Sequence, residues 1–142
     1  MNIKLKFKRL SDTAKLPSYA HAGDSGMDIY ANEEVHVLAH SCAKIRTGIA
    51  AVIPHGYEIQ VRPRSGMAAR GMVAAFGTVD GGYRGEICVT LYNHTDGLCL
   101  VYAGDRIAQL VLAPVVRADI DETDDLGEET ERGENGFGST GV

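Results

Sequence analysis

Apolar and polar residues alternate one by one along several short segments of the chain, which is the pattern of half-buried β-strands. Residues 3–8 alternate between apolar side chains and lysines, which is typical of a strand at the edge of a sheet. The same alternation returns over 57–62, after a mostly apolar run at 43–53 and a turn at Pro54-His55-Gly56. These segments predict an edge strand, a buried strand and a half-solvated strand.

Four more candidate strands follow along the chain. They are separated by stretches rich in Gly, Asn and Asp, which are typical of turns, and they cover residues 72–79, 83–92, 98–102 and 106–112. Helical periodicity is nearly absent, and one short helix is expected at 65–69, with Ser65 as its N-cap and Gly71 as a left-handed stop. We therefore predict an all-β sandwich or barrel with one short helix.

The composition fits one globular domain of 142 residues, with 44% hydrophobic and 23% charged residues. Lys and Arg number 14 against 19 Asp and Glu, and the net charge of −5 argues against a general nucleic-acid or membrane-surface binder. No apolar run has the length of a membrane span, and the N-terminus lacks the apolar region of a signal peptide. We expect a cytoplasmic protein that binds neither nucleic acid nor membrane.

The cysteines and histidines show no metal-binding spacing. Cys42, Cys88 and Cys99 lie in or beside apolar runs, and we interpret them as small buried hydrophobes in a reducing compartment. The five histidines form no H-E-x-x-H pattern. A zinc site made by protein ligands is therefore not expected.

The end of the chain differs from everything before it. Residues 119–131 carry eight carboxylates and no basic residue, which is typical of a solvated linker. Residues 132–141 contain four glycines, two hydroxyl groups, Arg132 and Phe137. Composition alone is typical of a disordered tail, but the same residues suit a flap that offers N–H groups and an arginine to phosphate and a ring to a base. We divide the chain into a β-domain at 1–118, a linker at 119–131 and a flap at 132–142.

A candidate phosphate site lies where the strand at 57–62 ends. The segment Arg62-Pro63-Arg64-Ser65-Gly66 places two arginines before a hydroxyl and a glycine that open the predicted helix. An anion there would meet guanidinium, hydroxyl and backbone N–H groups together. Seen alone, Arg62 and Arg64 are equally typical of surface salt-bridge partners.

A candidate catalytic carboxylate lies in the segment Gly77–Glu86, which is typical of a β-hairpin. Asp80 is either an ordinary turn residue or a group that orients and deprotonates a water. The hairpin also exposes main-chain donors and acceptors, which are needed to read the edge of a small planar base. Tyr83 either packs in the core or faces a sugar ring.

Two further polar positions accompany these segments. Asp28 follows a glycine-rich turn and would suit a hydrated Mg²⁺, although it would also suit a turn. Gln109 is a polar residue inside an apolar run that begins with the charged pair Asp105-Arg106. Each pattern is common on its own.

Taken in order, these segments resemble the five sequence motifs of the trimeric dUTPases (dUTP diphosphatases). The matching blocks span nearly the whole chain and are residues 22–31, 63–68, 77–87, 104–110 and 132–141. The resemblance implies a jelly-roll-like, distorted β-barrel that forms a homotrimer, with each flexible C-terminal arm closing a neighbour's site. It also implies hydrolysis of dUTP to dUMP and pyrophosphate with Mg²⁺, which limits uracil in DNA and supplies dUMP for thymidylate. The strand pattern itself does not demand a trimer.

Residue roles follow from the positions that match the motifs. The resemblance implies that Asp80 orients the attacking water and that Tyr83 stacks on the deoxyribose. Main-chain groups of Gly77, Thr78 and Val79, and of the opposing strand near Cys88, would pair with uracil. Cytosine presents an amino donor where uracil presents O4, so cytosine would leave buried groups unpaired, at a cost on the order of 10⁴-fold.

The remaining roles concern the triphosphate. The resemblance implies that Arg64, Ser65, Gly66 and Gln109 hold the α and β phosphates and that Asp28 touches Mg²⁺ through water. In the flap, Arg132, Ser139 and Thr140 would grip the γ-phosphate, with Gly138 beside them and Phe137 over the uracil. Departures from the family pattern are Asp24, Met27, Asn135 and Ala74, the last at a position that many bacterial members fill with a base-contacting asparagine.

Two alternatives stay open at this point. A dCTP deaminase shares the fold that the resemblance implies, but Asp80 within Asp-Gly-Gly-Tyr fits a hydrolase that activates water better. A nucleotide-binding regulator without turnover would need neither Asp80 nor the flap. We therefore favour dUTP hydrolysis, with dUTP as the small-molecule partner.

Overall fold

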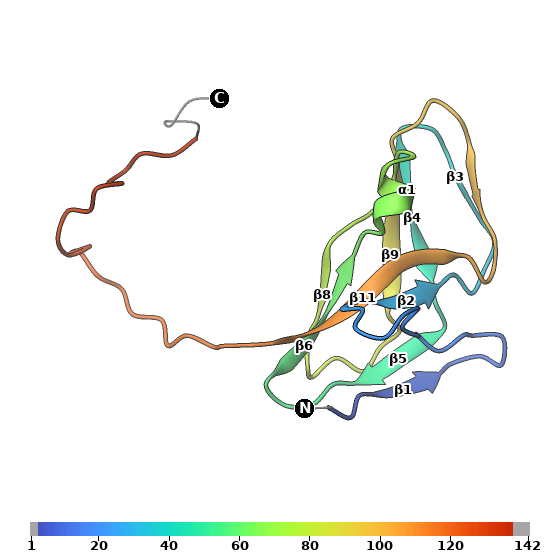
Figure 1. The fold of residues 1–142 in the computed structure, drawn as a ribbon, viewed down its shortest axis with the longest axis horizontal. Coiled ribbons are helices and arrows are strands. Elements are labelled where there is room, and N and C mark those ends of the chain that lie inside the picture. The colour runs from blue at the N-terminus through green and yellow to red at the C-terminus, as the bar shows by residue number, and fades with distance from the viewer. Residues whose placement is uncertain (1–2, 138–142) are drawn as a thin grey trace.

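The computed structural model describes residues 3–137, and its strands gather into one body from which the C-terminal residues extend (Figure 1). The described part contains eleven strands and one four-residue helix. In chain order they are β1 (Lys6–Arg9), β2 (Met27–Tyr30), β3 (Val35–Val37), β4 (Ser41–Arg46), β5 (Ile49–Val52), β6 (Tyr57–Arg62), α1 (Ser65–Ala68), β7 (Met72–Ala74), β8 (Gly77–Val79), β9 (Cys88–Asn93), β10 (Cys99–Val101) and β11 (Arg106–Pro114). The predicted all-β fold with one short helix is confirmed.

The strands form four small antiparallel sheets. The largest has the order β2-β11-β6-β8, and a second has the order β4-β9-β7. Two-stranded ribbons, β1-β5 and β10-β3, complete the body. The described strands therefore do not close into one continuous barrel. Most neighbours in a sheet are far apart in sequence, so the fold depends on long-range pairing.

One apolar cluster joins the two larger sheets. Ile29 of β2, Ile59 of β6 and Leu110 of β11 are fully buried, as are Val89 and Leu91 of β9. Their neighbours along each strand are more exposed, as the alternating pattern predicts. Burial of the apolar face fixes the register of each strand, because a slip by one residue would expose it.

Two strands predicted as single segments are each divided. In the run 43–53, Gly48 adopts a φ of +68°, and a Cβ there would lie 2.8 Å from the Ala14 Cβ, so the chain bends between β4 and β5. The run 72–79 changes sheets, because β7 pairs with β9 whereas β8 pairs with β6. The prediction of continuous strands is wrong at both places.

Two other expectations differ from the structure, and one strand was missed. The strand predicted at 83–92 begins only at Cys88, because the backbone N–H of Tyr83 turns back to the Asp80 carbonyl at 3.0 Å. The strand β3 was not predicted. Ser65 is not the N-cap of α1, since that position belongs to Arg64, but Gly71 has the expected left-handed φ of +83°.

The cysteines are less buried than predicted. Cys42 is exposed, and Cys88 and Cys99 are half-buried. Cys42 points outward because Ile45, three residues later on β4, takes the core-facing register. The interpretation of all three as buried hydrophobes is therefore wrong, and the free thiols remain compatible with a reducing compartment.

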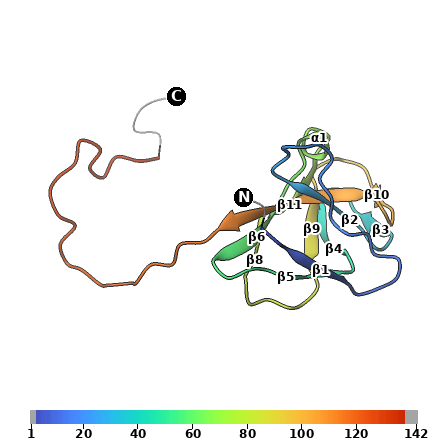
Figure 2. The same cartoon turned by 60° about the horizontal axis from the view of Figure 1, so that its bottom comes forward.

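The C-terminal residues leave the body after β11 ends at Pro114. The backbone N–H of Val115 donates to the Gly56 carbonyl at 2.8 Å, at the point of departure. Farther along, Val116, Ile120 and Leu126 are each 96% exposed. Figures 1 and 2 both show this segment extending away from the sheets. The division of the chain at 118 and 131 stays a prediction. None of the described helices is long and apolar enough to cross a bilayer.

Candidate active site

Strand register brings the predicted phosphate-binding residues to one place. Gln109 of β11 pairs with Asp28 of β2 on one side and with Arg62 of β6 on the other. The segment Arg64-Ser65-Gly66 follows directly after β6 and therefore lies beside them. A pocket of about 380 Å³ is lined by Asp28, Gln109 and the segment Arg64-Ser65-Gly66, whereas Arg62 lies outside it. Sequence positions as distant as 28, 64 and 109 thus form one cluster.

Asp28 holds two guanidinium groups in this pocket. Its Oδ1 accepts from Arg64 Nε at 3.0 Å, and its Oδ2 lies 3.4 Å from Arg106 Nη1. The Asp28 side chain is 15% exposed, so this carboxylate is partly screened from water. Arg64 also donates from Nη1 to the Arg106 carbonyl at 3.3 Å. The three side chains form a network across β2, β11 and the segment after β6.

The rest of the pocket offers neutral donors. Gln109 is fixed by donation from Nε2 to the Pro63 carbonyl at 2.9 Å. A Cβ at Gly26 would collide with the Gln109 amide, so a larger residue there would displace this side chain. Ser65 and Gly66 lie in the first turn of α1, where backbone N–H groups have no intrahelical partner. Together these groups are suited to an anion.

A second pocket of about 310 Å³ lies along the predicted hairpin. It is lined by the hairpin, by the first residue of β9 and by one residue of β4, namely Thr78, Val79, Asp80, Tyr83, Glu86, Ile87, Cys88 and Lys44. The Tyr83 hydroxyl donates to the Glu86 carbonyl at 3.0 Å, and a Cβ on Gly85 would collide with the Tyr83 ring. Tyr83 is 46% exposed, so it belongs to the pocket wall and not to the core.

Glu86 anchors this hairpin to the body. Its carboxylate accepts from the Gly48 backbone N–H at 2.7 Å and from Arg46 Nε at 2.9 Å. The hydrogen bond to Glu86 and its charge raise the pKa of Arg46. Burial raises the pKa of the Cys88 thiol, and the Glu86 charge adds to this effect, so Cys88 is a neutral thiol in the pocket.

The two pockets lie well apart within one chain. Gln109 and Val79 flank β6 on opposite sides, and they pair with Arg62 and Ile59, three residues apart. Strand spacings place the two residues about 10 Å apart along β6 and about 10 Å apart in the perpendicular direction across it. The direct distance between them is therefore about 14 Å. Asp80 follows Val79 and continues away from Gln109. A base acts within about 3 Å of the water that it activates, which is far less than this separation.

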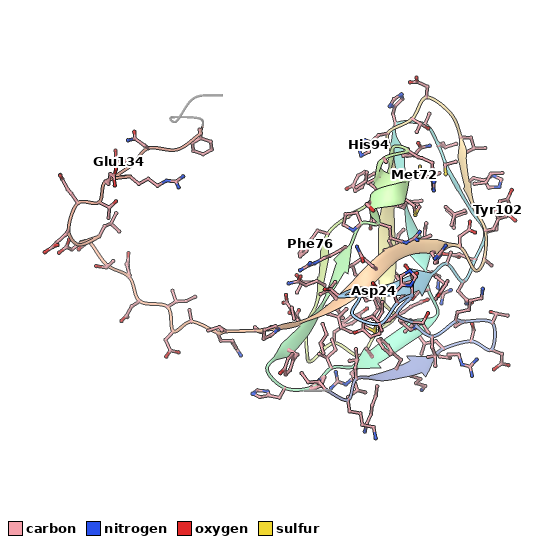
Figure 3. The ribbon with its side chains drawn as sticks, in the orientation of Figure 1. Asp24, Met72, Phe76, His94, Tyr102 and Glu134 are labelled. Carbon is pink, nitrogen blue, oxygen red and sulfur yellow. The ribbon has the colours of Figure 1, made fainter. Side chains whose placement is uncertain are left out.

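Other predicted site residues lie away from both pockets. Ala74 is 2% exposed, and its methyl group belongs to the apolar core. Arg132 and Phe137 lie in the extended C-terminal segment, and the Phe137 ring is fully exposed. Figure 3 shows Glu134 of this segment far from Asp24, which lines the phosphate pocket. Gly138, Ser139 and Thr140 lie outside the described residues.

The structure adds pocket residues that the sequence did not single out. Arg106 and His21 line the phosphate pocket, and Lys44 and Glu86 line the hairpin pocket. The sequence holds one indication of the position of Arg106. Two apolar residues follow it, where strict alternation along a strand allows only one. Nothing in the sequence distinguishes Lys44 as a pocket residue, because an exposed lysine on a strand is common.

An antiparallel all-β body with an anion pocket, and with a hairpin that presents a carboxylate and a tyrosine, defines a class of all-β proteins suited to a phosphorylated ligand. Within that class the chain is placed by direct comparison. The family model for dUTPase matches residues 12–141, and the chain belongs to the dUTPase family.

Individual relatives agree with this assignment. The deoxyuridine 5'-triphosphate nucleotidohydrolase of Picosynechococcus sp. is 49% identical over 97% of this chain and 99% of its own. A mutant dUTPase of Staphylococcus bacteriophage 80alpha, solved with dUpNHpp, superposes with a TM-score of 0.89 at 30% identity, over 99% of this chain and 100% of the other. A mutant dUTPase from phage phi11 of S. aureus, described with a structural Mg(II) ion, gives a TM-score of 0.83 at 25% identity, over 89% of this chain and 100% of the other.

Proposed function

We propose that this dUTPase hydrolyses dUTP to dUMP and pyrophosphate, limiting uracil incorporation into DNA and supplying dUMP for dTMP synthesis. The observation that carries the proposal is the convergence of Asp28, Arg64, Ser65, Gly66 and Gln109 on one pocket suited to phosphates. The family membership of the chain supports the same reaction.

In this proposal the phosphate pocket holds the α and β phosphates. The Arg64 guanidinium neutralises charge on the pyrophosphate leaving group, while the Ser65 hydroxyl and the N–H groups of Ser65 and Gly66 donate hydrogen bonds. Gln109 is held by its bond to the Pro63 carbonyl, so its amide is already oriented when substrate enters. Because Gln109 is fixed before binding, its amide needs little reorganisation during the reaction.

The hairpin pocket reads the base and the sugar. Main-chain groups of residues 77–79 and of Cys88 pair with the edge of uracil, and the neutral Cys88 thiol adds no charge beside the base. Tyr83 packs on the deoxyribose and leaves no room for a 2′-hydroxyl. Its ring is held by the bond to the Glu86 carbonyl, and Glu86 is held in turn by Gly48 and Arg46.

Asp80 acts as the base in the chemical step. Its carboxylate accepts a proton from the water that attacks the α-phosphorus, and the P–O bond to the pyrophosphate breaks. The C-terminal flap contributes Arg132, Ser139 and Thr140 to the γ-phosphate and Phe137 to the uracil. Closure of the flap excludes bulk water and fixes the in-line geometry.

A divalent metal is generally required in this family, and we propose Mg²⁺ for this chain. Within residues 3–137 no group of three His, Cys, Asp or Glu is arranged to hold a metal. Mg²⁺ usually keeps several waters and takes oxygens from substrate phosphates, so one carboxylate beside the triphosphate is a fitting partner. Asp28 provides that carboxylate through water. When bound, Mg²⁺ offsets charge on the phosphates.

We also propose a homotrimer with active sites shared between chains. The separation of about 14 Å between Gln109 and Val79 supports this proposal, because Asp80 of one chain does not reach phosphates held by the same chain. In this proposal a neighbouring copy supplies the hairpin, and the C-terminal segment, which extends away from its own body (Figure 2), closes the site of another copy. The proposed compartment is the cytoplasm, where Cys42 would stay reduced.

The reaction is tested by measuring pyrophosphate release from dUTP, dCTP, dTTP and UTP side by side, with and without Mg²⁺. We expect Mg²⁺-dependent release from dUTP and at least about 10³-fold less from the other three, because each leaves buried polar groups unpaired or collides with the hairpin. Ammonia release from dCTP would instead favour a deaminase. Binding of dUTP without any turnover would favour a regulator.

A Tyr83→Ala substitution is expected to admit UTP. Removal of the ring opens the space beside the sugar, so kcat/KM for UTP should rise while that for dUTP falls about tenfold through lost packing. The ratio of the two kcat/KM values is the measurement, and Tyr83→Phe is the matched control because it keeps the ring. Unchanged rejection of UTP by Tyr83→Ala would place sugar discrimination elsewhere.

A further inference from the structure

A β-bulge at the start of β11 turns Arg106 toward the phosphate pocket. Arg106 pairs with Tyr30 and Ala108 pairs with Ile29, so two steps on β11 correspond to one step on β2. Ile107 and Ala108 are consequently both buried, although they are neighbours in sequence. Strict alternation from Ala108 would bury the Arg106 side chain in the core. The extra residue places it instead on the face that carries Asp28.

The position of Arg106 changes the charge balance at Asp28. Arg64 Nε and Arg106 Nη1 lie 3.0 and 3.4 Å from separate oxygens of the same carboxylate. Two positive groups therefore share one negative group, and the three side chains keep one net positive charge at the pocket. The nearby Asp24 carboxylate accepts from the backbone N–H of His21 at 2.8 Å.

We infer that Arg106 is a positioning residue for the triphosphate, and that it acts by sharing the Asp28 carboxylate so that Arg64 can bind phosphate. Without Arg106, Asp28 would pair with Arg64 alone, and a phosphate would have to displace the carboxylate from that guanidinium. With Arg106 in place, Asp28 keeps a partner when Arg64 turns to the substrate. The inference rests on the proposed phosphate site and goes beyond it, since Arg106 need not touch the substrate.

The test uses binding of α,β-imido-dUTP to the full-length chain without Mg²⁺, measured by calorimetry. Arg106→Gln should weaken binding about tenfold, which is the size expected for one charge-assisted hydrogen bond that must be broken. Arg106→Lys keeps the charge and should bind within about threefold of the unmodified chain. Arg70→Gln is the matched control, because Arg70 is an exposed arginine near α1 that does not line the pocket of Asp28.

The double variant Asp28→Asn with Arg106→Gln distinguishes positioning from direct contact. If Arg106 acts through Asp28, removing the carboxylate should restore binding to within about threefold of the unmodified chain. Asp28→Asn alone should change Mg²⁺-free binding by less than about threefold, because Arg106 already relieves Arg64 of the carboxylate, and a tightening of about tenfold or more would contradict the inference. This single variant keeps the inference testable even if Arg106→Gln does not fold, which a melting curve would show.

Three results would overturn the inference. Weak binding that Asp28→Asn does not restore would mean that Arg106 touches phosphate directly. Unchanged binding in Arg106→Gln, or an equal loss in Arg70→Gln, would remove any specific role. Arg64→Gln separates the two proposals, because if it leaves binding unchanged, the proposed phosphate site itself is wrong.

Discussion

Replacing Asp80 with asparagine is expected to lower kcat for dUTP about 10³-fold or more while the dissociation constant for dUTP stays within about threefold. The amide has nearly the shape of the carboxylate, but it cannot take a proton from the attacking water. Asp80 is exposed at the end of β8 and outside the apolar core, so the fold should be unaffected. Single-turnover kinetics and calorimetry measure the two quantities separately.

Asp96→Asn is the matched control for this variant. Asp96 is also an exposed turn aspartate, but it pairs with His40 at 2.9 Å and lines neither of the two site pockets. We expect it to keep full turnover. Full turnover in Asp80→Asn would show that another group orients the water. A lowered Tm in Asp80→Asn would instead indicate a structural role for the hairpin turn.

Strands with one solvated face were readable from the sequence. Residues 57–62 alternate clearly and became β6, and the apolar run at 106–112 became most of β11. The run 72–79 was not readable, because its apolar residues fit either of two sheets. The change of partner from β9 to β6 is decided by long-range packing. Local pattern thus gives the period of a strand but not its partner.

The sequence predicted which residues form the candidate site better than it predicted how far apart they lie. Motif order pointed to Asp28, Arg64 and Gln109, and strand register brings these three residues together. The separation of Asp80 from them depends on where β8 pairs along β6, which no local pattern records. The orientation of the Arg106 side chain depends on a β-bulge. In the sequence this bulge is visible only as one extra apolar residue after Arg106.

A chain that ends at residue 131 is expected to lose about 10²-fold or more in kcat/KM for dUTP while its Tm stays nearly unchanged. The flap would supply contacts to the γ-phosphate and uracil and would exclude water, and loss of such positioning costs about this much. Within the described residues this segment lies away from the core, as the full exposure of Phe137 shows. Its removal should therefore change the free energy of unfolding by less than about 0.5 kcal/mol. Activity assays and melting curves on the same sample measure both effects.

Mixing this truncated chain with full-length Asp80→Asn tests whether sites are shared. Each variant alone is expected to keep about 1% of the activity or less, but one retains Asp80 and the other retains the flap. If a site takes these parts from different copies, co-refolding equal amounts should restore activity at about a quarter of the sites, since each part comes from the right chain half of the time. If both parts came from one chain, no mixture would recover. Absence of recovery, in mixed oligomers verified by native mass spectrometry, would show that Asp80 and the flap of one site belong to the same copy, and would contradict the proposed supply of these two parts by different copies.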